Sequence, residues 1–213
     1  MQRHYNLFDK FCLSIDQAVR ALTGHTQTSG RIYPAKHIQG PELTEAERKH
    51  AAALMRINHA GEICAQALYH GQAAISRCKE VQQKMQNAAA EEGDHLAWCQ
   101  KRLEELSSHP SYLNPLWYGG SFCIGLLAGM IGDDWSLGFV AETERQVIRH
   151  LEGHLQTLPT ADLRSHHILK QMEQDEAHHR DEAVACGARE LPNVIKQGMA
   201  LTAKIMVKIA YWV

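Results

Sequence analysis

The segment AAAEEGDHLAW, residues 88–98, decides the fold, because it sets acidic residues and a histidine into an otherwise apolar helical stripe. At about 100° per residue, Glu92 falls on the helix face that a core would bury. That face carries Met85, Ala89, Leu96, Cys99 and Leu103. His95 follows three residues later on the same stripe, whereas Glu91 shares a face of solvated composition. That second face carries Asn87, Asp94, Trp98, Arg102 and Glu105.

The same spacing returns 84 residues later as Glu176-x-x-His179, on a helix face shared with Leu169 and Met172. A single Glu-x-x-His pattern is more often a buried ion pair than a ligand pair, but a repeat of it is not expected by chance. Asp175 and His178 have the same spacing on a more polar face, so we rank that pair lower.

Each Glu-x-x-His helix is preceded by a helix with one more inward glutamate, Glu62 and Glu144, at offsets of 30 and 32 residues. Leucine, valine and isoleucine side chains fall within about 40° of Glu144, whereas Glu142 points about 160° away. Glu142 is therefore expected to be dispensable. The sequence predicts that four carboxylates and two imidazoles meet in the interior.

Four carboxylates buried together repel one another, and two divalent cations would bring their charge to zero. One glutamate from each of two helices plus Glu-x-x-His from each of two others is the pattern of ferritin-like di-iron and di-manganese bundles. Oxygen-rich ligation with one imidazole per metal suits iron(II) or manganese(II) better than structural zinc. The predicted metal ligands are Glu62, Glu92, His95, Glu144, Glu176 and His179.

Other histidines are weaker candidates. His59 and His150 are predicted to support the ligands by hydrogen bonds, although either one alone is more often structural. The remaining histidines that we considered are expected at the surface: His25, His37, His109, His166 and His167.

Hydrophobic periodicity predicts an all-α protein, a ferritin-like four-helix bundle with a long crossover between its second and third helices and an extra helix at each end. A capping box at Thr44–Glu47 opens the bundle. The expected helices cover residues 7–22, 44–77, 80–107, 134–157 and 160–188, followed by a C-terminal helix within 191–213. SSHPSYLNPLWYGG, residues 107–120, is expected to break the helical pattern. We predict one domain over residues 1–213: an N-terminal helix and linker (1–43), the metal-binding bundle (44–190) and an amphipathic C-terminal helix (191–213).

Composition excludes some classes of protein. A net charge of −2 provides no basic field for nucleic acid. Six cysteines without a CxxC pair and an N-terminus, MQRHYNLFDKF, without a signal-peptide pattern favour a reducing cytosol. The uncharged segment 119–132 is shorter than the roughly 20 residues of a transmembrane helix.

Four stretches together resemble the demethoxyubiquinone hydroxylase family of ubiquinone biosynthesis in its bacterial form. They are LMRINHAGEICAQALYHGQA, EEGDHLAWCQKRLEEL, GDDWSLGFVAETERQV and MEQDEAHHRDEA. The resemblance runs from about residue 25 to the C-terminus, and it implies a ferritin-like di-iron monooxygenase. The family's ligand pattern falls on the same six residues. One position departs from it: Leu151 follows His150 where other members have a tyrosine.

The resemblance implies two Fe²⁺ ions per subunit and oxygen-dependent hydroxylation of a polyprenyl methoxy-methyl-benzoquinol, with the quinol and O2 as substrates. Contacts with other ubiquinone-biosynthesis proteins and a homo-oligomer are compatible with that role. Two alternatives stay open from the residues alone: a ferroxidase or iron-storage bundle, and a non-enzymatic membrane-associated bundle.

A lipid substrate also fits two apolar segments. Lys196, Lys204 and Lys208 form one stripe of the C-terminal helix, whose apolar body contains Met199, Ile205, Met206, Ile209 and Trp212. Such a helix either lies in an anionic membrane surface or docks on the bundle with its lysines in water. The segment 119–132 could border a greasy tunnel or insert shallowly, through Phe122, Ile124, Leu126, Leu127 and Met130. We therefore predict peripheral association with the cytoplasmic side of the cell membrane.

Overall fold

The structure is a computed structural model that describes residues 7–213, and within this range it contains seven helices and no strand. They are α1 (Leu7–Leu22), α2 (Glu45–Ile75), α3 (Lys79–Glu105), α4 (Asn114–Ile131), α5 (Asp133–Thr157), α6 (Leu163–Ala185) and α7 (Asn193–Ala210). The predicted all-α class is confirmed. We expected no signal peptide at the N-terminus, and residues 1–6 of that segment lie outside the described residues.

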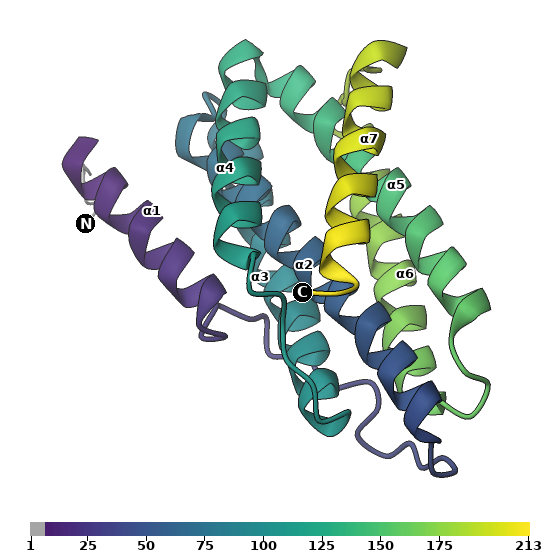
Figure 1. The fold of residues 1–213 in the computed structure, drawn as a ribbon. Helices are drawn as coiled ribbons and strands as arrows, with labels where there is room; N and C mark the ends of the chain where they lie inside the picture. Colours follow the sequence, from purple (N-terminus) through teal and green to yellow (C-terminus); the bar gives the residue numbers. More distant parts are fainter. Residues whose placement is uncertain (1–6) are drawn as a thin grey trace.

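Helices α2, α3, α5 and α6 form the central bundle (Figure 1). The predicted capping box opens α2: the Thr44 hydroxyl accepts a hydrogen bond from the Glu47 amide at 3.3 Å, and the Glu47 carboxylate accepts one from the Thr44 amide at 2.9 Å. Short loops, 76–78 and 158–162, make α2–α3 and α5–α6 antiparallel neighbours. One end of the bundle is filled by apolar side chains that include Met55, Leu103, Leu151, Leu169 and Met172.

The crossover contains a helix that we did not predict, because α4 includes residues 114–120, where we expected a break. Pro115 stands in the first turn of α4, where the missing N–H would have had no helical partner. Gly71 of α2 and Gly125 of α4 let the two backbones touch, since a Cβ on either would collide with a carbonyl of the other helix. Helix α4 therefore packs flat against α2 (Figure 1).

The segment 23–43 covers α3 and corrects our expectation of a solvated face there. Asp94, Trp98 and Arg102 are 2%, 4% and 5% exposed, although we placed all three on the solvated side. Residues 26–31 cross α3 at Gly93, where a Cβ would collide with the Gln27 carbonyl. The periodicity of α3 was interpreted correctly as helical, but residues 26–31 bury this face at Asp94, and at Arg102 it contacts Asp162 and Ser165 at the start of α6.

Helices α1 and α7 lie outside the bundle. Helix α1 has the predicted bounds and contacts the bundle through Ala18 and Ala21, which pack with Ile63 and Leu96. Helix α7 packs on α2 through Met206 and Val207. No helix among residues 7–213 is both long enough and apolar enough to cross a membrane.

Candidate metal centre

The structure brings the six predicted ligand residues to one buried cluster in the middle of the bundle. Glu62 comes from α2, Glu144 from α5, and each Glu-x-x-His pair from α3 or α6. All six are between 0% and 5% exposed. The ligand atoms of Glu62, Glu92, His95 and Glu176 lie within 4.8 Å of one another, close enough to share a metal ion.

Both histidines direct Nδ1 at the carboxylates. His95 Nδ1 lies 3.0 Å from Glu176 Oε1, 3.2 Å from Glu92 Oε2 and 3.6 Å from Glu62 Oε2. His179 Nδ1 lies 3.1 Å from Glu176 Oε2 and 3.3 Å from Glu92 Oε1. Glu92 and Glu176 therefore contact both imidazoles, as expected of carboxylates placed between two metal positions.

The other nitrogen of each imidazole is held by a carboxylate from the opposite helix. His95 Nε2 lies 3.0 Å from Asp175 of α6, and His179 Nε2 lies 2.9 Å from Glu91 of α3. An Nε2–H donated to these carboxylates leaves the Nδ1 lone pair for a metal. We had ranked Asp175 low and had placed Glu91 on a solvated face. The missed signal is that an acidic residue immediately precedes the glutamate of both Glu-x-x-His motifs.

The electrostatics of the cluster call for a cation. Burial and the charge of Glu92 raise the pKa of Glu62 well above its ordinary value. Burial and the charge of Glu176 do the same to the pKa of Glu144. Burial opposes protonation of His95, but the carboxylates of Asp175 and Glu176 outweigh it and raise the pKa of His95. Without a metal, the cluster therefore reduces its negative charge by holding protons.

The donor set fits a pair of divalent metals. Glu92 Oε1 is fully buried and accepts no hydrogen bond from the described residues, although His179 Nδ1 is only 3.3 Å away. A buried carboxylate oxygen without a donor is costly unless a cation binds it. Two divalent ions would satisfy this oxygen and balance the four carboxylates.

Other residues near the cluster differ from our expectations. The buried Tyr69 hydroxyl donates to Glu144, a contact that we did not predict. His59 pairs instead with the side-chain amide of Asn114 at 3.3 Å, and the His150 ring meets the His154 ring edge to face, with 3.9 Å between the ring centroids. The five histidines expected at the surface are exposed.

Glu142 was expected to be dispensable, but it is buried, at 4% exposure. Its carboxylate accepts hydrogen bonds from Arg145 and from Gln146, and Gln146 also reaches a backbone carbonyl of α7. Its direction away from Glu144 was inferred correctly from the helix period. Its exposure was not, because α7 covers that side of α5.

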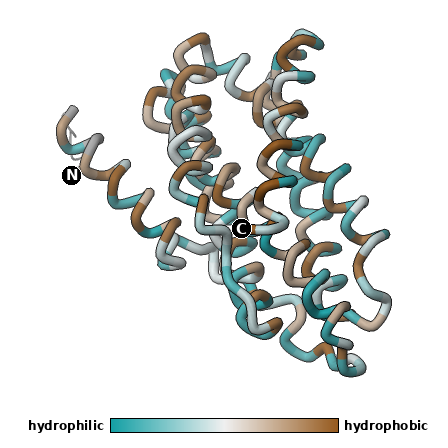
Figure 2. The backbone as a smooth tube through the Cα atoms, viewed as in Figure 1, coloured by the Kyte–Doolittle hydropathy of each residue, from teal (hydrophilic) through white to brown (hydrophobic). Residues whose placement is uncertain are grey.

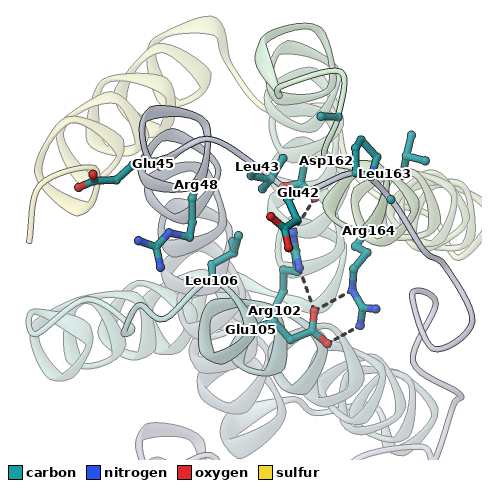
Figure 3. A pocket seen from close by; sticks show the side chains of 13 residues that line it. Glu42, Leu43, Glu45, Arg48, Arg102, Glu105, Leu106, Asp162, Leu163 and Arg164 are labelled. Atoms are coloured by element: carbon teal, nitrogen blue, oxygen red, sulfur yellow. Dashed lines mark hydrogen bonds and ion pairs between the residues drawn. The ribbon is translucent and has the colours of Figure 1, made fainter.

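A cavity of about 450 Å³ lies at one end of the bundle, away from the cluster (Figure 3). Arg102 and Glu105, which line it, follow His95 by seven and ten residues on α3, about 10–15 Å along the helix. Its walls are closed by ion pairs, Arg102 with Asp162 at 2.7 Å and Arg164 with Glu105 at 2.5 Å. Such a charged pocket does not suit an apolar ligand, and the chemistry belongs to the cluster.

A four-helix bundle with two such half-sites defines a ferritin-like carboxylate–histidine protein. Residues 49–210 match the model of the family described as Ubiquinone biosynthesis protein COQ7, and the chain belongs to this family.

Curated relatives named 3-demethoxyubiquinol 3-hydroxylase match nearly the whole chain. The chain is 53% identical to one from Acinetobacter baylyi over 211 residues, 99% of this chain and 100% of the relative. It is 50% identical to one from Nitrosococcus oceani over 211 residues, 99% of each chain. One from Nitrosospira multiformis is 53% identical over 205 residues, 96% of this chain and 98% of the relative.

Proposed function

We propose that this chain is an oxygen-dependent hydroxylase of a 3-demethoxyubiquinol, with two iron ions in the cluster. The proposed ligands are Glu62, Glu92, His95, Glu144, Glu176 and His179. The observation that carries the proposal is the buried set of four carboxylates and two imidazoles, with one carboxylate oxygen left without a donor. The names of relatives at 50–53% identity support the reaction and the substrate.

Oxygen-rich ligation with one imidazole per metal favours iron(II) or manganese(II). When bound, an iron pair supplies the activation of O2 that hydroxylation of a quinol ring requires. The chain itself binds the metals and fixes both imidazoles through Asp175 and Glu91. A small pocket reaches the ligand His179, and its lining includes the apolar side chains of Met85, Leu137, Val140 and Ala183.

The outer helices support a membrane-borne substrate. Helix α4 exposes Leu127 and Met130 at 62% and 63%, and α7 exposes Leu201 and Ile205 at 62% and 51%. In Figure 2 hydrophobic residues recur along α1, α4 and α7, on the side of the bundle that these helices cover. Exposed apolar side chains on these outer helices suit peripheral association with a bilayer, where a polyprenyl quinol resides.

The function is tested with purified, iron-reconstituted protein. We expect two irons per chain and, under ¹⁸O2 with a short-chain demethoxyquinol and a reductant, one ¹⁸O atom in the new ring hydroxyl by mass spectrometry. Label from water instead of O2 would contradict the proposal. Oxidation of added Fe²⁺ into a stored mineral without quinol product would favour the ferroxidase alternative.

A further inference from the structure

The segment Thr26–Arg31, called the strap, crosses α3 on the side that carries Asp94. Asp94 accepts hydrogen bonds from the strap amides of Ser29 and Gly30, at 3.1 and 3.2 Å, and from the Ser29 hydroxyl. Gln66 of α2 donates to the Thr26 hydroxyl at 2.6 Å. The strap lies outside residues 49–210, the part that the family model matches.

The strap ends by placing Arg31 against α6. The guanidinium makes two hydrogen bonds to Asp175, at 2.6 and 3.0 Å, and lies over the Trp98 ring at 5.1 Å. This paired, planar geometry is specific to arginine and fixes both carboxylate oxygens. The Trp98 ring also contacts His95, with 5.2 Å between the ring centroids.

Asp175 contacts both Arg31 and the predicted metal ligand His95, so it connects the two. One of its oxygens, Oδ2, accepts from Arg31 and also lies 3.0 Å from His95 Nε2. The two hydrogen bonds from Arg31 therefore hold the Asp175 carboxylate in the orientation in which it faces the imidazole.

At the second half-site, the carboxylate that contacts His179 has no arginine hydrogen-bonded to it among the described residues. Glu91 holds His179 Nε2 at 2.9 Å, but the side chain of Glu91 is 38% exposed, against 14% for Asp175. Arg31 also acts on Glu91 through its charge, but makes no hydrogen bond to this carboxylate in the described part of the chain. Within residues 7–213, each imidazole thus has a carboxylate partner at Nε2, but only the partner of His95 is itself held by an arginine.

We infer that Arg31 is a positioning residue that, through Asp175, makes the metal position at His95 bind more tightly than the position at His179. The inference rests on the proposed two-metal site. The reason is preorganisation: an imidazole already held in the ligating orientation loses less freedom when the metal binds.

The test is titration of the metal-free protein with Co²⁺, followed by its visible absorption bands. Wild type should bind two equivalents with separable affinities. In Arg31→Met the tighter equivalent should weaken by about tenfold, and the other should change by less than about twofold. Arg31→Lys should fall between, since lysine cannot make the paired contact.

Arg164→Met is the matched control, because Arg164 makes an equally exposed paired contact, to Glu105, away from the cluster. It should leave both equivalents unchanged. Arg31→Met should also add little to Asp175→Asn, since both act on one imidazole.

Three results would overturn the inference: two unchanged equivalents in Arg31→Met, equal weakening of both equivalents, or additive effects of Arg31→Met and Asp175→Asn. Absence of Co²⁺ binding in folded wild type would overturn the proposed function as well. Binding of two equivalents by wild type with no effect of Arg31→Met would overturn the inference alone.

Discussion

The four bundle helices bury charge, whereas the three outer helices expose apolar side chains. Glu92, at 0% exposure, and Glu176, at 1%, lie at the centre of the bundle. Leu116 and Leu127 of α4, at 63% and 62%, face outward. Ordinary folding puts these residue types in the opposite places.

Each arrangement costs folding stability, and the proposed function gives each a use: metal binding inside the bundle and contact with a membrane outside it. Buried carboxylates cost several kcal/mol apiece unless a cation neutralises them. An exposed leucine forgoes about 1.5–3 kcal/mol of burial that a lipid or apolar partner can supply. A bound cation would offset the first cost, and an apolar contact would offset the second.

The largest expected effect breaks the inner half of this comparison. Glu92→Ala or Glu176→Ala should remove most of both irons, because each carboxylate contacts both imidazoles and is expected to bridge. Iron content after reconstitution measures this. The control, Glu142→Ala, should keep its iron but lower the unfolding free energy by about 0.5–1.5 kcal/mol, because it removes the acceptor of hydrogen bonds from the partly buried Arg145 and Gln146. Full iron in Glu92→Ala would show that the cluster is not the metal site.

A smaller effect concerns the metal-free bundle and its pH dependence. Against the effect of burial, neighbouring carboxylates raise the pKa values of His95 and His179 in the folded chain well above that of an ordinary histidine, so above pH 7 the folded state holds more protons than the unfolded state. Stability must then fall as pH rises, by up to about 1.4 kcal/mol per pH unit for each extra proton. Buried histidines with lowered pKa values, such as His59 at about 4, do not contribute in this range.

Thermal unfolding of metal-free protein between pH 7 and 9 should show this decline. Metal-loaded protein should show a flatter profile, because metal charge replaces the protons. The same slope in both forms would mean that the titrating groups lie outside the cluster.

The sequence was sufficient for the inner region because the interior of a helix bundle is governed by one period. The faces of Glu92 and Glu144 follow from 100° per residue, and the doubled Glu-x-x-His follows from spacing alone. Asp175 and Glu91 were missed because their partners lie on another helix, and their only mark in the sequence is that each precedes the glutamate of a Glu-x-x-His motif.

The outer region was less predictable, because its burial depends on tertiary contacts. Asp94 is buried by the strap and Glu142 lies beneath α7, two coverings that leave no periodic trace. Residues 114–120 form a helix although Gly119 and Gly120 have a weak helix propensity. The close contact of α4 with α2 at Gly125 stabilises the helix as a whole. The stripe of free lysines on α7 is also shorter than predicted. Lys196 forms an ion pair with Glu190 at 2.7 Å, whereas Lys204 and Lys208 are exposed.

The smallest expected effect tests the outer half of the comparison. If α4 and α7 face a bilayer, the protein should sediment with anionic phosphatidylglycerol vesicles, and added salt should weaken binding by screening the lysines. Reversing Lys204 and Lys208 to glutamate changes charges worth about 1 kcal/mol each at such a surface, so binding should fall more than tenfold. Lys196→Glu, the control, should change binding less because Lys196 is already paired. Iron content should stay at two per chain, since the cluster lies in the inner bundle. Vesicle binding that ignores both salt and the Lys204/Lys208 reversal would exclude the lysines from the contact, whereas loss of iron in the same variant would mean that α7 supports the bundle instead of a membrane.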